Sequence, residues 1–257
     1  MAFSSIASLV LEQWGAKVEE IPTSSTEESD LLATLDGCRL LIEEKTKFDD
    51  PTRMRERGAT LRSGKIHIAT TPIAPSNRLS GIVRKAVSQL QSSSTEVEYD
   101  LRAIWFTGTG TVAKAKYLQF IATLYGSTGV YEKDRAGLKT CYFFRNSEFY
   151  RHAHTLDGAI VGYVSGASVV VKLCLNPLSV NWRKLRDSPF AHHFTTGLVD
   201  PLAEEASGEA YIADTAADRN DQSAVLGYVQ EKYRLGPVMN MDLGVTTATI
   251  SVPANEP

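Results

Sequence analysis

Residues 30–45 read DLLATLDGCRLLIEEK, so two apolar runs flank the pair Asp36-Gly37. An Asp-Gly pair between apolar runs is typical of a β-hairpin with a two-residue turn, because both turn positions need a positive φ angle. This turn makes Leu35 the partner of Cys38 and fixes the register of the whole hairpin. The register predicts that Asp30, at the start of the first strand, faces Glu43 on the second.

The same register gathers three charged side chains. Lys45 follows Glu43 by two residues, so the two lie on one face of the strand, which Asp30 shares across the hairpin. Facing carboxylates destabilise a sheet unless a cation lies between them. Mg²⁺, or Mn²⁺ in its place, prefers such oxygen ligands and keeps waters for a substrate phosphate. We therefore predict that Asp30 and Glu43 hold a metal and that Lys45 positions water or stabilises charge on a phosphate.

The pattern resembles the restriction-endonuclease-like superfamily, in which an acidic residue on one strand is followed, across a hairpin, by (Asp/Glu)-x-Lys on the next. Ser29-Asp30-Leu31-Leu32 and the segment LLIEEK at 40–45 carry this resemblance, although many members have Pro where Ser29 stands. The lead-in LEQWGAKVEEIP at 11–22 and the segment RKAVSQL at 84–90 are also similar. The resemblance covers about the first half of the chain. It implies an α/β fold with a mixed β-sheet flanked by helices, and a metal-dependent nuclease, either an endonuclease or an exonuclease, with DNA favoured over RNA as the substrate.

Further site residues follow from the resemblance. Many members contribute another acid from the first helix, where Glu12 is the acid present, and Glu28 competes because it would face Lys45 if the first strand began earlier. Members often carry Gln on the helix after the triad, which makes Gln89 a candidate. Lys85 lies one helical turn before Gln89 and could contact a phosphate, although either residue could also be an ordinary surface residue.

Basic residues are concentrated in one segment. Residues 45–85 contain ten Lys or Arg against three Asp or Glu, whereas the whole chain carries a net charge of -3. Residues 200–221 carry seven acids and one Arg. One face of the molecule is therefore expected to meet phosphates, through Lys47, Arg53, Arg55 and Lys85. A solvated basic loop is the competing interpretation.

The 257 residues, 43% of them hydrophobic, are enough for a sizeable core. We expect a nuclease-like α/β core over 1–126 and a strand-rich region over 127–257 that either belongs to the same domain or is appended to it. Residues 47–65 predict a loop or a short helix. Apolar periodicity predicts helices over 3–14, 78–91, 112–124 and 223–233, and strands over 65–70, 101–107, 139–145, 158–164, 168–175 and 245–252.

The remaining features limit the functional class. No apolar run approaches the roughly 20 residues that span a bilayer, and no signal-peptide pattern opens the chain, so a cytoplasmic protein without membrane association is expected. The three cysteines form no C-x-x-C pair. His152, His154, His192 and His193 are interpreted as structural or surface residues. A homodimer or a protein complex fits a nuclease of this kind. Two rival functions remain: an inactive nuclease-fold module that binds nucleic acid or protein within a larger complex, and an unrelated α/β binding protein with a chance Glu-x-Lys.

Overall fold

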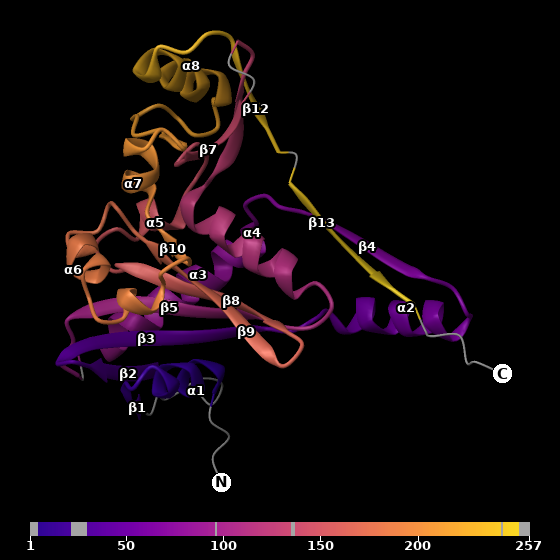
Figure 1. Cartoon of the computed structure of the whole chain (residues 1–257), viewed down its shortest axis with the longest axis vertical. Helices are drawn as coiled ribbons and strands as arrows, with labels where there is room; N and C mark the ends of the chain where they lie inside the picture. The colour runs from indigo at the N-terminus through magenta and orange to yellow at the C-terminus, as the bar shows by residue number, and fades with distance from the viewer. Residues whose placement is uncertain (1–4, 22–29, 96, 135–136, 243, 252–257) are drawn as a thin grey trace.

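The computed structural model describes residues 5–21, 30–95, 97–134, 137–242 and 244–251, and of Asp30 only the backbone. A seven-stranded mixed sheet lies at the centre, flanked by helices on both faces (Figure 1). Its strand order is β1-β2-β3-β5-β8-β9-β10. These strands are β1 Lys17–Ile21, β2 Asp30–Leu35, β3 Cys38–Lys47, β5 Leu101–Gly108, β8 Gly158–Ser165, β9 Ser168–Leu175 and β10 Leu198–Val199.

The predicted hairpin is confirmed. Asp36 and Gly37 adopt φ angles of 47° and 79°, as a two-residue turn of this hand requires. β2 and β3 are antiparallel, and their register runs from Leu35 opposite Cys38 to Leu31 opposite Ile42. β3 also pairs in parallel with β5, so it lies inside the sheet and is buried on both faces.

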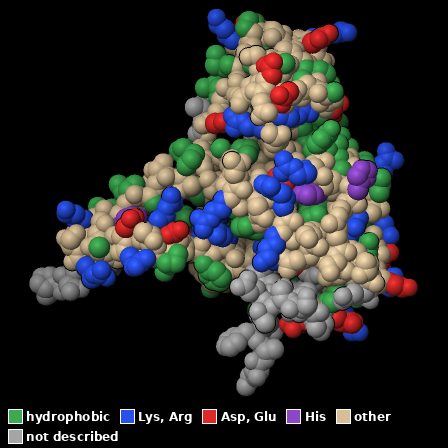
Figure 2. All heavy atoms as spheres, turned by 180° about the vertical axis from the view of Figure 1, so that it is seen from behind, with side chains coloured by type: hydrophobic (Ala, Val, Ile, Leu, Met, Phe, Trp, Pro, Cys, Tyr) green, Lys and Arg blue, Asp and Glu red, His purple; other side chains and the backbone are tan. Residues whose placement is uncertain are grey.

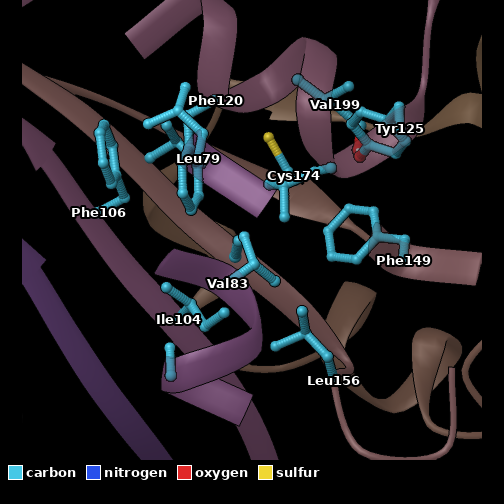
Figure 3. Packing of buried hydrophobic residues seen from close by; sticks show 14 of the residues in the cluster. Leu79, Val83, Ile104, Phe106, Phe120, Tyr125, Phe149, Leu156, Cys174 and Val199 are labelled. Carbon is cyan, nitrogen blue, oxygen red and sulfur yellow. The ribbon is translucent and has the colours of Figure 1, made fainter. Parts of the chain in front are cut away.

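Helices α3 (Asn77–Ser93) and α4 (Ala113–Tyr125) cover one face of the sheet. Both were predicted from apolar spacing, and α3 buries Leu79 and Val83 against the sheet, with Ile104 in the same cluster (Figure 3). Phe106 of β5 stacks on Phe120 of α4 with 3.9 Å between the ring centroids. This face of β3 bears Leu41, and therefore also Glu43 and Lys45, by the alternation of a strand.

Helix α1 (Ile6–Gln13) covers the opposite face, together with α6 (Trp182–Arg186) and the short 3-10 helix η1 (Ala191–His193). The predicted first helix is confirmed, and the Ser5 hydroxyl caps it by accepting a hydrogen bond from the Ser8 amide at 3.1 Å. On this face Leu40, Ile42 and Trp105 are fully buried.

A second, four-stranded sheet has the order β11-β7-β6-β12. It comprises β6 Thr128–Glu132, β7 Gly137–Tyr142, β11 Ala210–Ile212 and β12 Val238–Met241, and lies near helices α5 Glu148–Arg151, α7 Pro201–Ala206 and α8 Gln222–Tyr233. Strands β8, β9 and β10 instead join the central sheet, where β8 pairs in parallel with β5. Strands from both sides of residue 126 thus share one sheet.

Helix α2 (Pro51–Arg62), β4 (His67–Pro72) and β13 (Val245–Ile250) form an arm that projects from the rest of the molecule (Figure 1). β4 and β13 pair antiparallel along their full length. For residues 47–65 the sequence left a loop or a short helix open, and the structure has the helix α2 in this segment. The Asp50 carboxylate caps α2 by accepting a hydrogen bond from the Thr52 amide at 2.9 Å, and Pro51 occupies the first turn of the helix. Among the described residues, no helix combines the length and the apolar character needed to cross a bilayer.

Candidate functional site

The carboxylate of Glu43 is the centre of the candidate site. Its side chain is fully buried, and that of Lys45 is 11% exposed. Lys45 Nζ donates a hydrogen bond to Glu43 Oε1. Glu43 Oε2 is buried as well, yet no described residue donates to it. A buried carboxylate oxygen without a donor is unfavourable, so a further cation or donor at this atom would be stabilising.

The backbone of the hairpin continues toward the predicted metal partner. Leu31 pairs with Ile42, and Asp30 is the next residue of β2, so its backbone follows the register that leads to Glu43. Asp30 also pairs with Ile21 of β1. The side chain of Asp30 and the whole of Glu28 lie outside the described residues.

A cavity of about 320 Å³ opens beside Lys45. Its lining residues come from β3, α3 and β5, and are Lys45, Thr46, Lys47, Ile82, Lys85, Gln89 and Phe106. The structure thus brings the two predicted α3 residues, Lys85 and Gln89, to the same cavity as Lys45. Gln89 Oε1 is buried and accepts no hydrogen bond from a described residue.

Glu12 lies away from this cavity. It is exposed on α1, which packs over the face of the sheet opposite to Glu43. The acid that meets α1 is Glu44, whose Oε1 accepts a hydrogen bond from the Ala7 amide at 3.1 Å near the start of that helix. The structure therefore gives Glu44 a role in holding α1. Strand alternation could have separated Glu44 from Glu43, but the helix that it contacts could not be foreseen.

Asp49 joins the arm to the body, a role that its place in a basic segment did not reveal. Its carboxylate accepts from Lys116 Nζ at 2.6 Å and from the Thr111 amide at 2.9 Å, and lies 3.3 Å from Arg57 Nη1. Burial alone would raise the pKa of Asp49, but the hydrogen bonds from Lys116 and Thr111 hold this pKa below its ordinary value. Asp49 thereby links α2, through Arg57, to α4, through Lys116.

A second cavity, of about 670 Å³, lies between the arm and the body, and we call it the arm groove. Its cationic lining residues are Lys47, Arg53, Arg57, Arg78 and Lys116. Lys47 lines both cavities, so the arm groove adjoins the cavity beside Lys45. Partial burial and the neighbouring Arg78 and Lys116 lower the pKa of Lys47. Arg55 does not line the groove; it contacts Pro51 and Thr52 within its own helix.

The other candidate ligands have structural surroundings. His193 stacks on Trp14 with 5.0 Å between the ring centroids, and His152 Nε2 lies 3.4 Å from Glu148 Oε2. Cys141 and Cys174 are buried free thiols, and burial raises the pKa of each to about 12. These thiols are therefore protonated and unreactive at neutral pH.

No group of three or more His, Cys, Asp or Glu side chains able to hold a metal is found among the described residues, which do not include the side chain of Asp30. The chain matches no protein-family model, no curated protein and no solved structure in the comparisons made. The residues around Glu43 are therefore the features of this chain from which a function can be inferred.

Proposed function

We propose that this protein is a divalent-metal-dependent nuclease that hydrolyses phosphodiester bonds, with DNA as the favoured substrate. The observation that carries the proposal is the fully buried Glu43, which has one oxygen bound by Lys45 and the other without a donor among the described residues. The mixed α/β architecture and the hairpin register are consistent with the restriction-endonuclease-like fold that the sequence resembles.

Glu43 and Asp30 would hold the metal. The unpartnered Oε2 of Glu43 suits Mg²⁺, which binds carboxylate oxygens and retains waters for a substrate phosphate. A bound Mg²⁺ supplies charge stabilisation at the phosphate and lowers the pKa of a bound water. Asp30 enters through its place in the hairpin register, one residue beyond the pair of Leu31 and Ile42.

Lys45 and Gln89 would act on the substrate and on the attacking water. The Lys45 ammonium is fixed by its bond to Glu43 and lines the cavity, where it can stabilise negative charge that builds on the phosphate oxygens. Gln89 lines the same cavity, and its Oε1, which has no donor among the described residues, can accept a hydrogen bond from a water and orient that water for attack.

The test must separate catalysis from folding. Removing one partner of a buried ion pair costs about 3–5 kcal/mol, because the other charge stays buried alone. The double substitution Glu43→Gln/Lys45→Met removes both charges and keeps both shapes. We expect this variant to fold with a Tm near that of the wild type, to bind no Mg²⁺ or Mn²⁺ in calorimetry, and to cleave nothing.

Cleavage is assayed on plasmid, linear duplex, single-stranded DNA and RNA, each with Mg²⁺, Mn²⁺ or EDTA. The matched control is Arg39→Ala, which removes an exposed ion pair at the other end of the same strand and should cleave as the wild type does. Cleavage by the folded double variant would overturn the assignment of Glu43 and Lys45.

A second candidate function is an inactive nuclease-fold module that binds nucleic acid or protein. The direct bond from Lys45 to Glu43 favours it, because an ion pair can also satisfy a buried carboxylate without any metal. A folded wild-type protein that neither binds a divalent cation nor cleaves any substrate would support this second function.

A further inference from the structure

The arm exposes a helix that the rest of the chain does not cover. α2 has twelve residues, none of them buried, and four of them are arginines. A helix that is polar on all sides gains little from packing within its own protein. The arm is also tied to the body through Asp49, so its position is defined although its surface is exposed. Such an element is suited to contact something outside the chain.

Charge identifies the kind of partner. Residues 45–85, which include α2 and β4, carry a net charge of +7, while the rest of the chain carries -10. Figure 2 shows Lys and Arg side chains along the projecting arm and on the adjoining part of the body. A local positive field on an otherwise acidic protein attracts a polyanion to this surface and repels it from the others.

The cations of the arm groove fall into two groups. Arg57 and Lys116 are held by Asp49 at 3.3 and 2.6 Å, so they have a structural partner. Lys47 and Arg53 form no ion pair with a described carboxylate. Arg78 lies 3.9 Å from Asp50 and is 67% exposed, which makes its pairing weak. These three cations can therefore contact phosphates without breaking a strong ion pair to a described carboxylate.

We propose that the arm groove holds the phosphate backbone of a double-stranded nucleic acid, with Lys47, Arg53 and Arg78 as its phosphate contacts. Lys47 follows Lys45 by two residues on β3, a separation of about 6.6 Å, so it leads the nucleic-acid backbone from the groove to the cavity beside Lys45. This last step rests on the proposed nuclease function, whereas binding in the groove does not.

The lining of the groove favours a duplex over a single strand. Proteins that bind single strands stack successive bases on several aromatic rings. Among the described residues that line the groove, Phe48 is the one Phe, Tyr or Trp. Lysines and arginines recognise phosphates, which a duplex presents on its outside. Recognition is therefore expected to be independent of base sequence.

The test is the salt dependence of binding, measured by fluorescence anisotropy with a labelled DNA duplex in EDTA, so that no cleavage intervenes. Each phosphate contact contributes about 0.9 to the slope of log Kd against log salt concentration. The variant Lys47→Ala/Arg53→Ala should lower this slope by about 2 and weaken binding. The matched control Arg55→Ala/Arg62→Ala removes the same charge from residues outside the groove lining and should change the slope by less than about 1.

Equal decreases in slope and affinity for the two double variants would contradict duplex binding in the arm groove. Tighter binding of a single strand than of the duplex would contradict it as well. The Glu43→Gln/Lys45→Met variant should still bind the duplex, with a slope lower by no more than about 1, because Lys45 is at most one further phosphate contact. Duplex binding through Lys47 and Arg53 without cleavage would leave the groove in place and remove the nuclease. Cleavage by the wild type, together with normal duplex binding by the Lys47→Ala/Arg53→Ala variant, would support the nuclease function and contradict binding in the arm groove.

Discussion

Glu43 shows how one buried carboxylate constrains its surroundings. An ionised carboxylate inside a sheet must be paired or bound to a cation, because its desolvation is expensive. Lys45 satisfies one oxygen of Glu43 and leaves the other without a donor among the described residues. Gln89 Oε1 is a second buried acceptor without a described donor, on a residue that lines the cavity beside Lys45. Buried acceptors of this kind are stabilised when a further donor or cation reaches them.

Gln89 provides a residue-scale prediction. Its Oε1 makes no hydrogen bond with a described residue, so Gln89→Ala removes no bond of that atom and should change stability by less than about 1 kcal/mol. If Gln89 orients water, the single-turnover cleavage rate should fall about 10- to 100-fold. Ser88→Ala, at the exposed neighbouring position, serves as the control. A rate equal to that of the wild type would remove Gln89 from the site.

Asp49 provides a prediction on pH. Its pKa in the folded protein lies below the ordinary 3.8, so its contribution to stability is complete above 3.8 and is lost as the pH falls through the lower, folded value. Asp49→Asn should remove this part of the acid sensitivity and loosen the arm. Limited proteolysis should then cut within 51–72 faster than in the wild type. Glu12→Gln, at an exposed position of α1, is the control, and equal cutting rates in both variants would contradict the role of Asp49.

At the scale of elements, two glycines offer opposite predictions for one substitution. Gly37 has a φ angle of 79° and Gly81 lies inside α3, and an added Cβ would meet nothing within 4 Å at either position. Gly37→Ala should destabilise the fold by about 1–2 kcal/mol, because the residue must stay left-handed. Gly81→Ala should stabilise it by up to about 1 kcal/mol. Urea unfolding measures the change in the free energy of unfolding for each variant, and changes of the same sign would contradict the turn geometry.

Local patterns predicted some elements and not others. Local sequence was sufficient to predict the hairpin, α3, α4 and β5. The hairpin is predicted by its turn pair, and the other three elements are predicted by the spacing of their apolar residues. β1 was missed because Glu19 and Glu20 at the exposed edge of the sheet interrupt the alternation. The helix α2 has no apolar face, so apolar periodicity could not distinguish a helix from a loop in this segment. The N-cap Asp50 and Pro51 in the first turn are the features that define the helix.

At the scale of the whole molecule, the central sheet depends on both halves of the chain. β5 pairs in parallel with β8, and Trp105 and Phe106 of β5 are fully buried. A fragment of residues 1–126 lacks β8 and would expose the edge of β5. We expect it to show no cooperative thermal unfolding by circular dichroism, in contrast to the full chain. Cooperative unfolding of the fragment would mean that the first half folds alone.

The same long-range pairing limits what the sequence can say about the site. The register of the hairpin is local, so the sequence alone predicted that Glu43 and Lys45 share a face. Glu43 is buried on a strand that lies inside the sheet, and β4, which lines the arm groove, pairs with β13 from far along the chain. No pattern within 67–72 specifies a partner at 245–250, because β pairing over such distances is decided by the folded whole.

The pairing of β4 with β13 also sets an order of events during synthesis. β4 ends at Pro72 and β13 begins at Val245, so the ribosome adds 172 intervening residues before the second strand exists. At about 5–20 residues per second this takes roughly 10–35 s. During that interval the hairpin with Glu43 and Lys45 is already made, while the arm is incomplete. A nascent chain therefore presents Glu43 and the residues that line the arm groove, all within 47–119, before β4 has its partner strand, and the edge of β4 stays unpaired until late in translation.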